Sequence, residues 1–325
     1  MATGSLGSFV HGDDEVLRAL LRRRAAGSQP GARTEGQRIA LVIGGGGMRG
    51  AYSGGMVAAL DELNLRDCFD TVYGTSSGAF TAGAFVTGQG WGAGLIFQNH
   101  LACKAFIDVR RAAARGRPMV SLDYVIEVLT GANPMKWDVF LDSPIPLRVV
   151  ATRLPDLQPH TLTGLETVED WQVVMRAASS IPLLAGPPVD FGGDRWIDGS
   201  VSEPLAVGRA LAEGATHVLT LLCRASTEVR EQPGAGPAGL PFWGRSLDRL
   251  VPGLGTVANG SRRYSESLRM IRDVTHPGRG GAHLMAISPA QACGVSGLTI
   301  EVERVRRASD VGYRSVRAAA EAAAG

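Results

Sequence analysis

Two short stretches of the sequence carry residues that could do chemistry. The first, GGGMRG at residues 45–50, follows the apolar run IALVI and precedes a segment that we expect to be helical. Gly45, Gly47 and Gly50 have the spacing of a dinucleotide-binding loop. Their backbone N–H groups could equally hold a phosphate or the negative oxygen of a reacting ester. This stretch alone is therefore compatible with an oxidoreductase or a hydrolase.

The second stretch, VYGTSSGAF at residues 72–80, arranges Gly74, Ser76 and Gly78 as GxSxG. This pattern is typical of a nucleophile elbow, in which a serine sits on a tight turn from a strand to a helix and flanking glycines avoid clashes. The serine of a hydrolase needs N–H donors for the oxyanion of its tetrahedral intermediate. Because loops that follow parallel strands meet at one sheet edge, the two stretches can face one crevice.

Two alternatives make different demands on the sequence. A dinucleotide site expects an acidic residue at the end of the second strand, but Asp70 precedes that strand, which ends at Ser76. A serine triad needs a late histidine on a loop at the carboxyl edge. His217 and His283 sit at the starts of predicted strands, so His276 is the candidate that fits a triad.

Strands that alternate with helices predict an α/β fold with a parallel sheet. Thr167 and Asp170 form a capping-box pattern that opens one of the helices. The uncharged stretch 71–103 is interrupted by glycines, so we expect a buried helix, a glycine loop and a second helix there, and no membrane span. Predicted strands lie at 38–44, 70–76, 145–154, 194–199, 216–223 and 282–289, and predicted helices at 51–63, 77–86, 167–178, 204–213 and 299–322.

The chain is expected to form one domain preceded by an arm. Residues 1–36 read as a flexible N-terminal arm whose amphipathic piece ends in three arginines at 22–24, either a solvated tail helix or a contact with a membrane surface. Residues 37–325 form the domain, with a helical excursion at about 240–275 and a C-terminal helix. An apolar group in the excursion predicts either an interfacial flap or ordinary packing: Phe242, Trp243, Leu247, Leu250 and Val251.

Composition narrows the classes of partner. A net charge of +2 gives no basic excess for a nucleic-acid partner. The N-terminus lacks the continuous apolar segment of a secretory signal, so a cytoplasmic protein is expected. The four cysteines are far apart and suggest neither a zinc site nor a disulfide framework: Cys68, Cys103, Cys223 and Cys293.

In combination, four segments resemble the patatin-like phospholipase family. They are GGGMRG (45–50), GTSSG (74–78), ASSIP (178–182) and DGS (198–200), and the resemblance covers about residues 38–225. It implies a three-layer α/β/α sandwich with a mostly parallel central sheet and a Ser76–Asp198 dyad. We expect no cofactor and assign no metal-binding residue. Ser200 replaces the usual glycine or alanine, which leaves Asp198 in place but puts the detailed turn geometry in question. The implied oxyanion loop comprises Gly45, Gly46, Gly47, Met48, Arg49 and Gly50, with Gly74 and Gly78 in the elbow. Within the loop we expect Gly46, Gly47 and Met48 to donate their N–H groups to the oxyanion.

The expected function is that of a serine lipid acyl hydrolase, cytoplasmic or peripherally attached to a membrane. It would release fatty acid from a phospholipid, a lysophospholipid or a related lipid ester. Ser76 would attack the acyl carbonyl, and Asp198, with a pKa raised by partial burial, would accept its proton. A dinucleotide-binding oxidoreductase and a patatin-like protein that binds lipid without turnover remain as alternatives.

Overall fold

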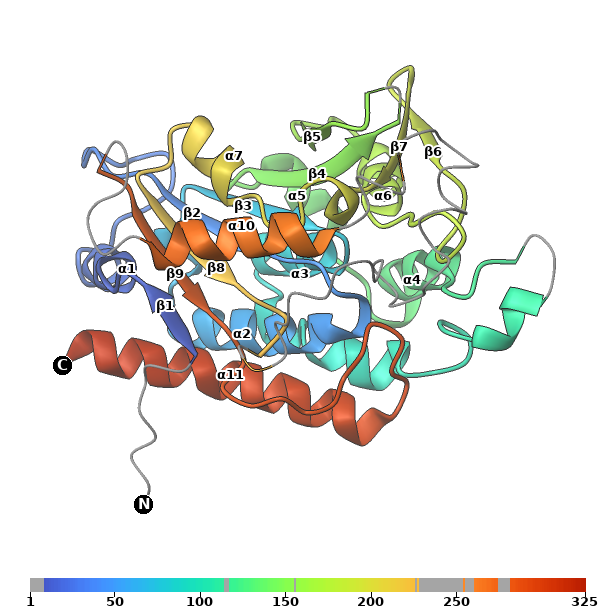
Figure 1. Cartoon of the computed structure of the whole chain (residues 1–325). Helices are drawn as coiled ribbons and strands as arrows, with labels where there is room; N and C mark the ends of the chain where they lie inside the picture. Colours follow the sequence, from blue (N-terminus) through green and yellow to red (C-terminus); the bar gives the residue numbers. More distant parts are fainter. Residues whose placement is uncertain are drawn as a thin grey trace.

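A mostly parallel sheet forms the centre of the molecule (Figure 1). The computed structural model describes residues 9–113, 117–154, 156–225, 227, 254, 260–273 and 281–325. Within these residues nine strands follow the order β1-β9-β8-β2-β3-β4-β7-β6, and β5 also pairs with β4. The parallel strands are β9 (His283–Ile287), β8 (His217–Leu221), β2 (Ile39–Ile43), β3 (Thr71–Thr75) and β4 (Leu147–Arg153). The antiparallel strands are β1 (Val10–Gly12), β5 (Pro159–Leu162), β6 (Val189–Phe191) and β7 (Asp194–Asp198).

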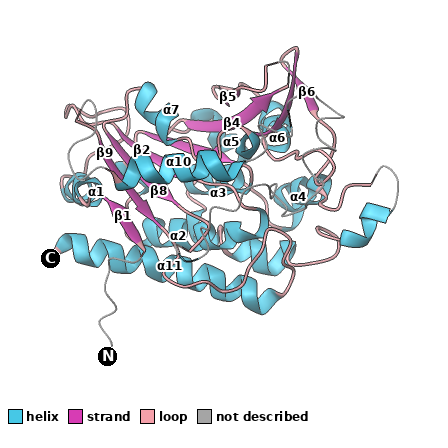
Figure 2. Cartoon of the chain, in the orientation of Figure 1, coloured by secondary structure: helices cyan, strands magenta, loops and turns pink. Residues whose placement is uncertain are grey.

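Helices cover both faces of this sheet, as the alternation of side chains along β2 requires. Ile39, Leu41 and Ile43 pack in one apolar cluster, whereas Ala40 and Val42 pack in another on the opposite face. The first cluster includes α1 (Glu15–Ala25), α2 (Gly50–Glu62), α3 (Ser77–Val86) and α11 (Val302–Ala324), and the second includes α7 (Val207–Ala212) and α10 (Gly260–Arg272). The strands thus lie between two helical layers (Figure 2), which confirms the predicted α/β/α sandwich.

Shorter elements surround the part of the sheet that follows β3. Thr167 Oγ1 accepts the N–H of Asp170 at 3.1 Å, so the predicted cap of α6 is confirmed. The predicted strands at 145–154, 194–199, 216–223 and 282–289 are β4, β7, β8 and β9. The remaining helices are α4 (Leu122–Glu127), α5 (Trp137–Asp142) and α6 (Val168–Ala177). Short 3₁₀ and π turns are η2 (Gly47–Arg49), η3 (Arg66–Cys68), η4 (Gly90–Gly92), η5 (Phe97–Leu101), η6 (Val109–Ala113), η7 (Val128–Ala132) and η8 (Gly199–Val201).

Residues 9–25 differ from the flexible arm expected of the N-terminal segment. Strand β1 pairs with β9 and extends the sheet, while Val16, Leu17 and Leu20 of α1 are fully buried. Pairing covers the backbone groups that the edge strand β9 would otherwise present. Arg23, expected in a solvated run, is buried and ion-paired with Asp70 and Glu35.

The helical excursion is represented in the structure by α10, which agrees with the later part of the predicted range 240–275. The apolar residues considered as an interfacial flap (Phe242, Trp243, Leu247, Leu250 and Val251) lie outside the described residues. Across the parts of the chain that are described, none of the helices has both the length and the apolar character needed to cross a membrane.

Helices α2 and α11 pack with their backbones in contact. A Cβ atom on Gly55 of α2 would lie 1.9 Å from the carbonyl oxygen of Ser309, and one on Gly312 of α11 would lie 2.0 Å from that of Tyr52. Because backbone atoms cannot rotate away as a side chain can, either methyl group would force the helices apart. This crossing fixes α2, whose first residue ends the glycine loop.

We predict that Gly55→Ala lowers the free energy of unfolding by about 1–3 kcal/mol, because the added methyl group overpacks the α2–α11 crossing. Gly208→Ala in α7 is the matched control, since a Cβ there has nothing within 4 Å. Alanine favours a helix over glycine by up to about 1 kcal/mol, so this control should keep or raise stability. Chemical denaturation of both variants is the measurement, and equal stabilities would contradict the prediction.

Candidate active site

Ser76 lies on a strained turn between β3 and α3. Its backbone has φ 54° and ψ −131°, a conformation that a residue with a side chain rarely adopts. The turn is held by close packing on both sides. A Cβ on Gly78 would lie 2.3 Å from the carbonyl oxygen of Ile43, and one on Gly74 would lie 2.5 Å from the Cα of Ala79. The turn therefore has the local shape that a nucleophile elbow requires.

Asp198 is the last residue of β7 and is fully buried. Antiparallel pairing of β7 with β4 sets its position, with Asp198 opposite Ala151. Its N–H donates to Ser180 O at 3.0 Å, and its own carbonyl accepts the hydroxyl of Thr152 at 2.9 Å. These two hydrogen bonds hold the backbone of Asp198 and do not involve its carboxylate.

The Asp198 carboxylate is only partly satisfied. Oδ1 accepts the N–H of Ser200 at 2.7 Å, and Oδ2 has no hydrogen-bond partner among the described residues. Burial raises the pKa of Asp198 from 3.8 to about 6, against the lowering effect of hydrogen-bonding groups on Ser76 and Ser200. No hydrogen bond joins the Ser76 hydroxyl to the Asp198 carboxylate among the described contacts. Ser200 departs from the family pattern, yet its backbone N–H still donates to Asp198 in this turn.

The glycine loop lies directly against Ser76. A Cβ on Gly45 would be 2.6 Å from the Cβ of Ser76, so a side chain cannot be accommodated there. The N–H of Gly46 donates to Ser77 Oγ at 3.1 Å. Gly47 has φ +59° and is exposed. In the described part of the chain, the N–H groups of Gly45 and Gly47 have no acceptor.

The second half of the loop is tied to other elements. The N–H of Met48 donates to Gly297 O at 3.1 Å, and the N–H of Arg49 donates to Gly46 O at 3.2 Å. The Met48 side chain is fully buried. A Cβ on Gly50 would lie 2.5 Å from the ring of Phe97. The expectation that Gly46 and Met48 donate to an oxyanion is therefore wrong for this structure, because their N–H groups already have acceptors, whereas those of Gly45 and Gly47 have none among the described residues.

A cavity of about 510 Å³ opens beside Ser76 and the glycine loop. Ser77, Phe80, Thr81 and Ala84 line it at helical spacing, so the cavity follows one face of α3 away from Ser76. Its remaining walls are mainly apolar, and Arg49 and Arg224 line it as cations. The arrangement suits a long apolar group bound next to a polar one.

Three site residues escaped the sequence analysis as contributors. Ser77 holds Gly46 in place, and its position directly after Ser76 was the available signal. Ser179 lines the cavity with a buried hydroxyl that lacks a hydrogen-bond partner among the described residues. Cys223 donates from Sγ to Gly45 O at 2.8 Å, and nothing in the sequence connects positions 178 residues apart.

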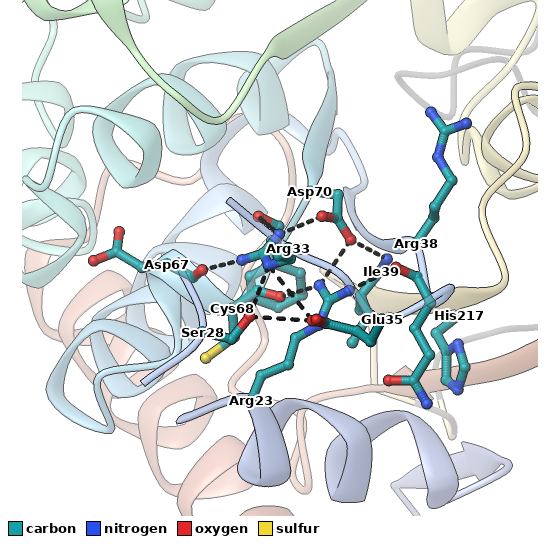
Figure 3. Close-up of polar contacts among 12 residues, drawn as sticks. Arg23, Ser28, Arg33, Glu35, Arg38, Ile39, Asp67, Cys68, Asp70 and His217 are labelled. Atoms are coloured by element: carbon teal, nitrogen blue, oxygen red, sulfur yellow. Dashed lines mark hydrogen bonds and ion pairs between the residues drawn. The ribbon is translucent and has the colours of Figure 1, made fainter. Parts of the chain in front are cut away.

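The acidic residue considered for a dinucleotide site is committed elsewhere. Asp70 lies at the amino end of β3, where its carboxylate accepts the N–H of Ile39 at 2.6 Å and pairs with Arg23 at 2.7 Å and with Arg33 (Figure 3). This edge of the sheet is opposite to the glycine loop, since β2 and β3 run parallel. Asp70 is therefore unavailable to a ligand bound at GGGMRG.

The two triad histidines that the structure describes, His217 and His283, lie away from Ser76. His217 and His283 stack on each other at the amino ends of β8 and β9, with ring centroids 4.6 Å apart, and burial lowers the pKa of His217 to about 4. His276 lies outside the described residues. No histidine is among the described residues that line the cavity. Searching the same residues also shows no group of three or more potential metal ligands.

Comparison with known proteins assigns the chain to a family. Residues 41–211 match the family described as "Patatin-like phospholipase", and the chain belongs to it. It is 30% identical over 187 residues to the "Uncharacterized protein YjjU" of Escherichia coli, a match that covers 57% of this chain and 51% of that protein. It is 27% identical over 189 residues to "Lysophospholipase NTE1" of Debaryomyces hansenii, covering 56% of this chain and 12% of that protein. The chain thus spans about half of the first relative and a small part of the second.

Among solved structures, the chain resembles a human cytosolic phospholipase A2, GIVD, with a TM-score of 0.47 and 13% identity, over 95% of this chain and 66% of that one.

Asp198→Asn should stabilise the folded protein at neutral pH. The folded-state pKa of about 6 exceeds the value of 3.8 used for a free carboxyl, so ionisation of Asp198 opposes folding. The stability contributed by the protonated group is fully present below pH 3.8 and is lost as pH rises through about 6. The shift corresponds to at most about 3 kcal/mol. Denaturation at several pH values should show the variant gaining on the wild type between pH 4 and pH 7, and a pH-independent difference would overturn the assignment.

Proposed function

We propose that the protein is a serine lipid acyl hydrolase that uses Ser76 as nucleophile and Asp198 as base. The observation that carries the proposal is the buried Asp198 carboxylate, whose unpartnered Oδ2 and raised pKa of about 6 accompany Ser76 on its strained turn. A base with this pKa is largely ionised at pH 7 and can still return a proton readily. No histidine is needed as an intermediary.

The reaction proceeds in two halves. Ser76 Oγ attacks the acyl carbonyl carbon and gives its proton to Asp198, after which the ester C–O bond breaks and the leaving oxygen takes that proton. Asp198 then takes a proton from water as the water oxygen attacks the acyl carbon. The bond from that carbon to Ser76 Oγ breaks, Asp198 returns the proton to Oγ, and the fatty acid leaves. The N–H groups of Gly45 and Gly47 are the proposed donors to the oxyanion in both halves, since neither has an acceptor among the described residues.

The cavity supports a lipid as the acyl donor. An acyl chain can extend from Ser76 along Phe80, Thr81 and Ala84, where it would be removed from water. Arg49 and Arg224 line the same cavity and could pair with a phosphate of a phospholipid or lysophospholipid. Nicotinamide dinucleotide binding is not favoured, because Asp70 is held in the opposite edge of the sheet.

Labelling with a fluorophosphonate tests the nucleophile and its base. The probe should modify Ser76 in the wild type, not label Ser76→Ala, and label Asp198→Asn at least about 100-fold more slowly, because the proton acceptor is lost. The labelling rate of the wild type should rise with pH and level off above about 6, where Asp198 is ionised.

Ser77→Ala is the matched control for these variants, since it alters the neighbouring serine and leaves the Ser76–Asp198 pair intact. It should keep the label on Ser76. Turnover of a phospholipid by the wild type separates a hydrolase from a protein that binds lipid without reaction. Labelling of Ser76→Ala at the wild-type rate would show that Ser76 is not the nucleophile.

Ala84 should set the acyl length that the cavity accepts, because it lines the cavity about two helical turns from Ser76. Ala84→Phe would block the passage, so kcat/KM for a 16-carbon ester should fall about 10-fold or more relative to that for a 4-carbon ester. Ala84→Ser changes little volume and should keep the wild-type preference. The ratio of the two kcat/KM values is the measurement, and an unchanged ratio in Ala84→Phe would show that the chain lies elsewhere.

A further inference from the structure

Two exposed apolar side chains lie beside the wall of the cavity. Val109 is 57% exposed and Leu183 is 49% exposed. They come from different segments that meet at Val120, which forms a β-bridge with Ile107 and donates its N–H to Leu184 O at 2.9 Å. Because Ile107, Val120 and Leu184 all line the cavity, both exposed residues lie near its rim.

Leu183 is held in a backbone conformation that leucine rarely adopts. Its φ is +69°, in the left-handed region that favours glycine and asparagine. The N–H groups of Leu184 and Ala185 both donate to Ile181 O, at 3.0 and 2.8 Å, and this hydrogen bonding fixes the turn around Leu183. Asparagine would adopt this backbone conformation with less strain, and the half-exposed side chain of Leu183 gains little from burial. Stability of the fold therefore does not explain leucine at this position.

The segment that contains Val109 carries an excess of positive charge in its sequence. The sequence of residues 104–117 has five basic residues, Lys104, Arg110, Arg111, Arg115 and Arg117, against one carboxylate, Asp108, which pairs with Arg110 at 2.7 Å. Arg111 donates to the carbonyl oxygens of Lys104 and Ala105, while Lys104 and Arg117 are exposed. Figure 1 shows η6, which begins at Val109, standing out from the body of the molecule.

From this arrangement we propose that the rim formed by Lys104, Val109, Arg117 and Leu183 is the surface that docks on an anionic lipid bilayer. Val109 and Leu183 enter the boundary between head groups and acyl chains, and Lys104 and Arg117 pair with lipid phosphates. The inference rests on the proposed function in one respect: a bilayer docked here presents its lipids to the cavity that holds Ser76. The charges favour a bilayer over an apolar protein groove, since a membrane with anionic head groups offers both partners at once.

The test is co-sedimentation with vesicles, made in a Ser76→Ala background so that no lipid is consumed. The vesicles contain 70% phosphatidylcholine and 30% phosphatidylglycerol, whose negative surface potential attracts basic residues. The double variant Val109→Ser/Leu183→Asn should bind these vesicles about 10-fold or more weakly than the parent protein. The double variant Lys104→Gln/Arg117→Gln should bind them about 10-fold more weakly. On pure phosphatidylcholine, this second variant should bind almost as well as the parent protein, because no anionic head group is present. Met270→Asn is the matched control: Met270 is 42% exposed on α10, next to Ile271, which packs on Gly12 of β1.

Two further measurements, of thermal stability and of ester hydrolysis, separate lost docking from unfolding and from lost catalysis. Leu183→Asn should keep or raise thermal stability, because asparagine tolerates the left-handed backbone, so lost binding cannot be assigned to unfolding. With Ser76 intact, all rim variants should hydrolyse a soluble monomeric ester at the wild-type rate. Absent binding to anionic vesicles, or equal losses in Met270→Asn and the rim variants, would overturn the docking surface. Failure of ester hydrolysis with normal vesicle binding would instead overturn the proposed function alone.

Discussion

Burial of one carboxylate is the constraint on which the site depends. Asp198 reaches its position because β7 reverses direction against β4, which places it opposite Ala151 at the end of the ladder. The following turn is equally tight, since a Cβ on Gly199 would lie 2.1 Å from the carbonyl oxygen of Val150. Removal from water raises the pKa of Asp198 to about 6, and an aspartate at its ordinary pKa would be a far weaker base. The edge of the sheet thereby supplies the chemical property that the proposed reaction requires.

The two ends of the strands are built differently. At the amino ends, Asp70 satisfies the N–H of Ile39 and pairs with Arg23 and Arg33, so the polar groups there hold one another. At the carboxyl ends, Ser76 has a strained backbone, and the N–H groups of Gly45 and Gly47 have no acceptor in the described residues. Strain and unpaired groups persist only where the surroundings fix them, and the parallel strands β2 and β3 provide that support.

Much of this could be predicted because the residues involved are local in sequence. The elbow at Ser76, the cap at Thr167 and the strands β4, β7, β8 and β9 each carry their own pattern over a few residues. The structure of residues 10–25 could not be predicted in this way. Strand β1 has only three residues, and it is recognisable as a strand only through its pairing with β9. Cys223 contacts Gly45 because β8 and β2 are neighbours in the sheet although they are far apart in the sequence. No local sequence pattern predicts such a contact. The direction in which each N–H of residues 45–50 points likewise required coordinates.

Unpaired buried polar groups do not by themselves identify a site, because this structure has them in unrelated places. His217 Nε2 is buried without a partner among the described residues, yet it stacks on His283 at the amino edge of the sheet. What distinguishes the Ser76 region is convergence. Ser179 and Gly47 line the cavity that opens beside Ser76, and the Ser76 side chain acts on the pKa of the buried Asp198 carboxyl. The buried Ser179 hydroxyl costs free energy while it lacks a partner, and the carbonyl oxygen of an acyl group bound beside Ser76 could accept hydrogen bonds from that hydroxyl and from the N–H of Gly47. That shared requirement supports a reacting ester at this position more strongly than either glycine pattern does alone.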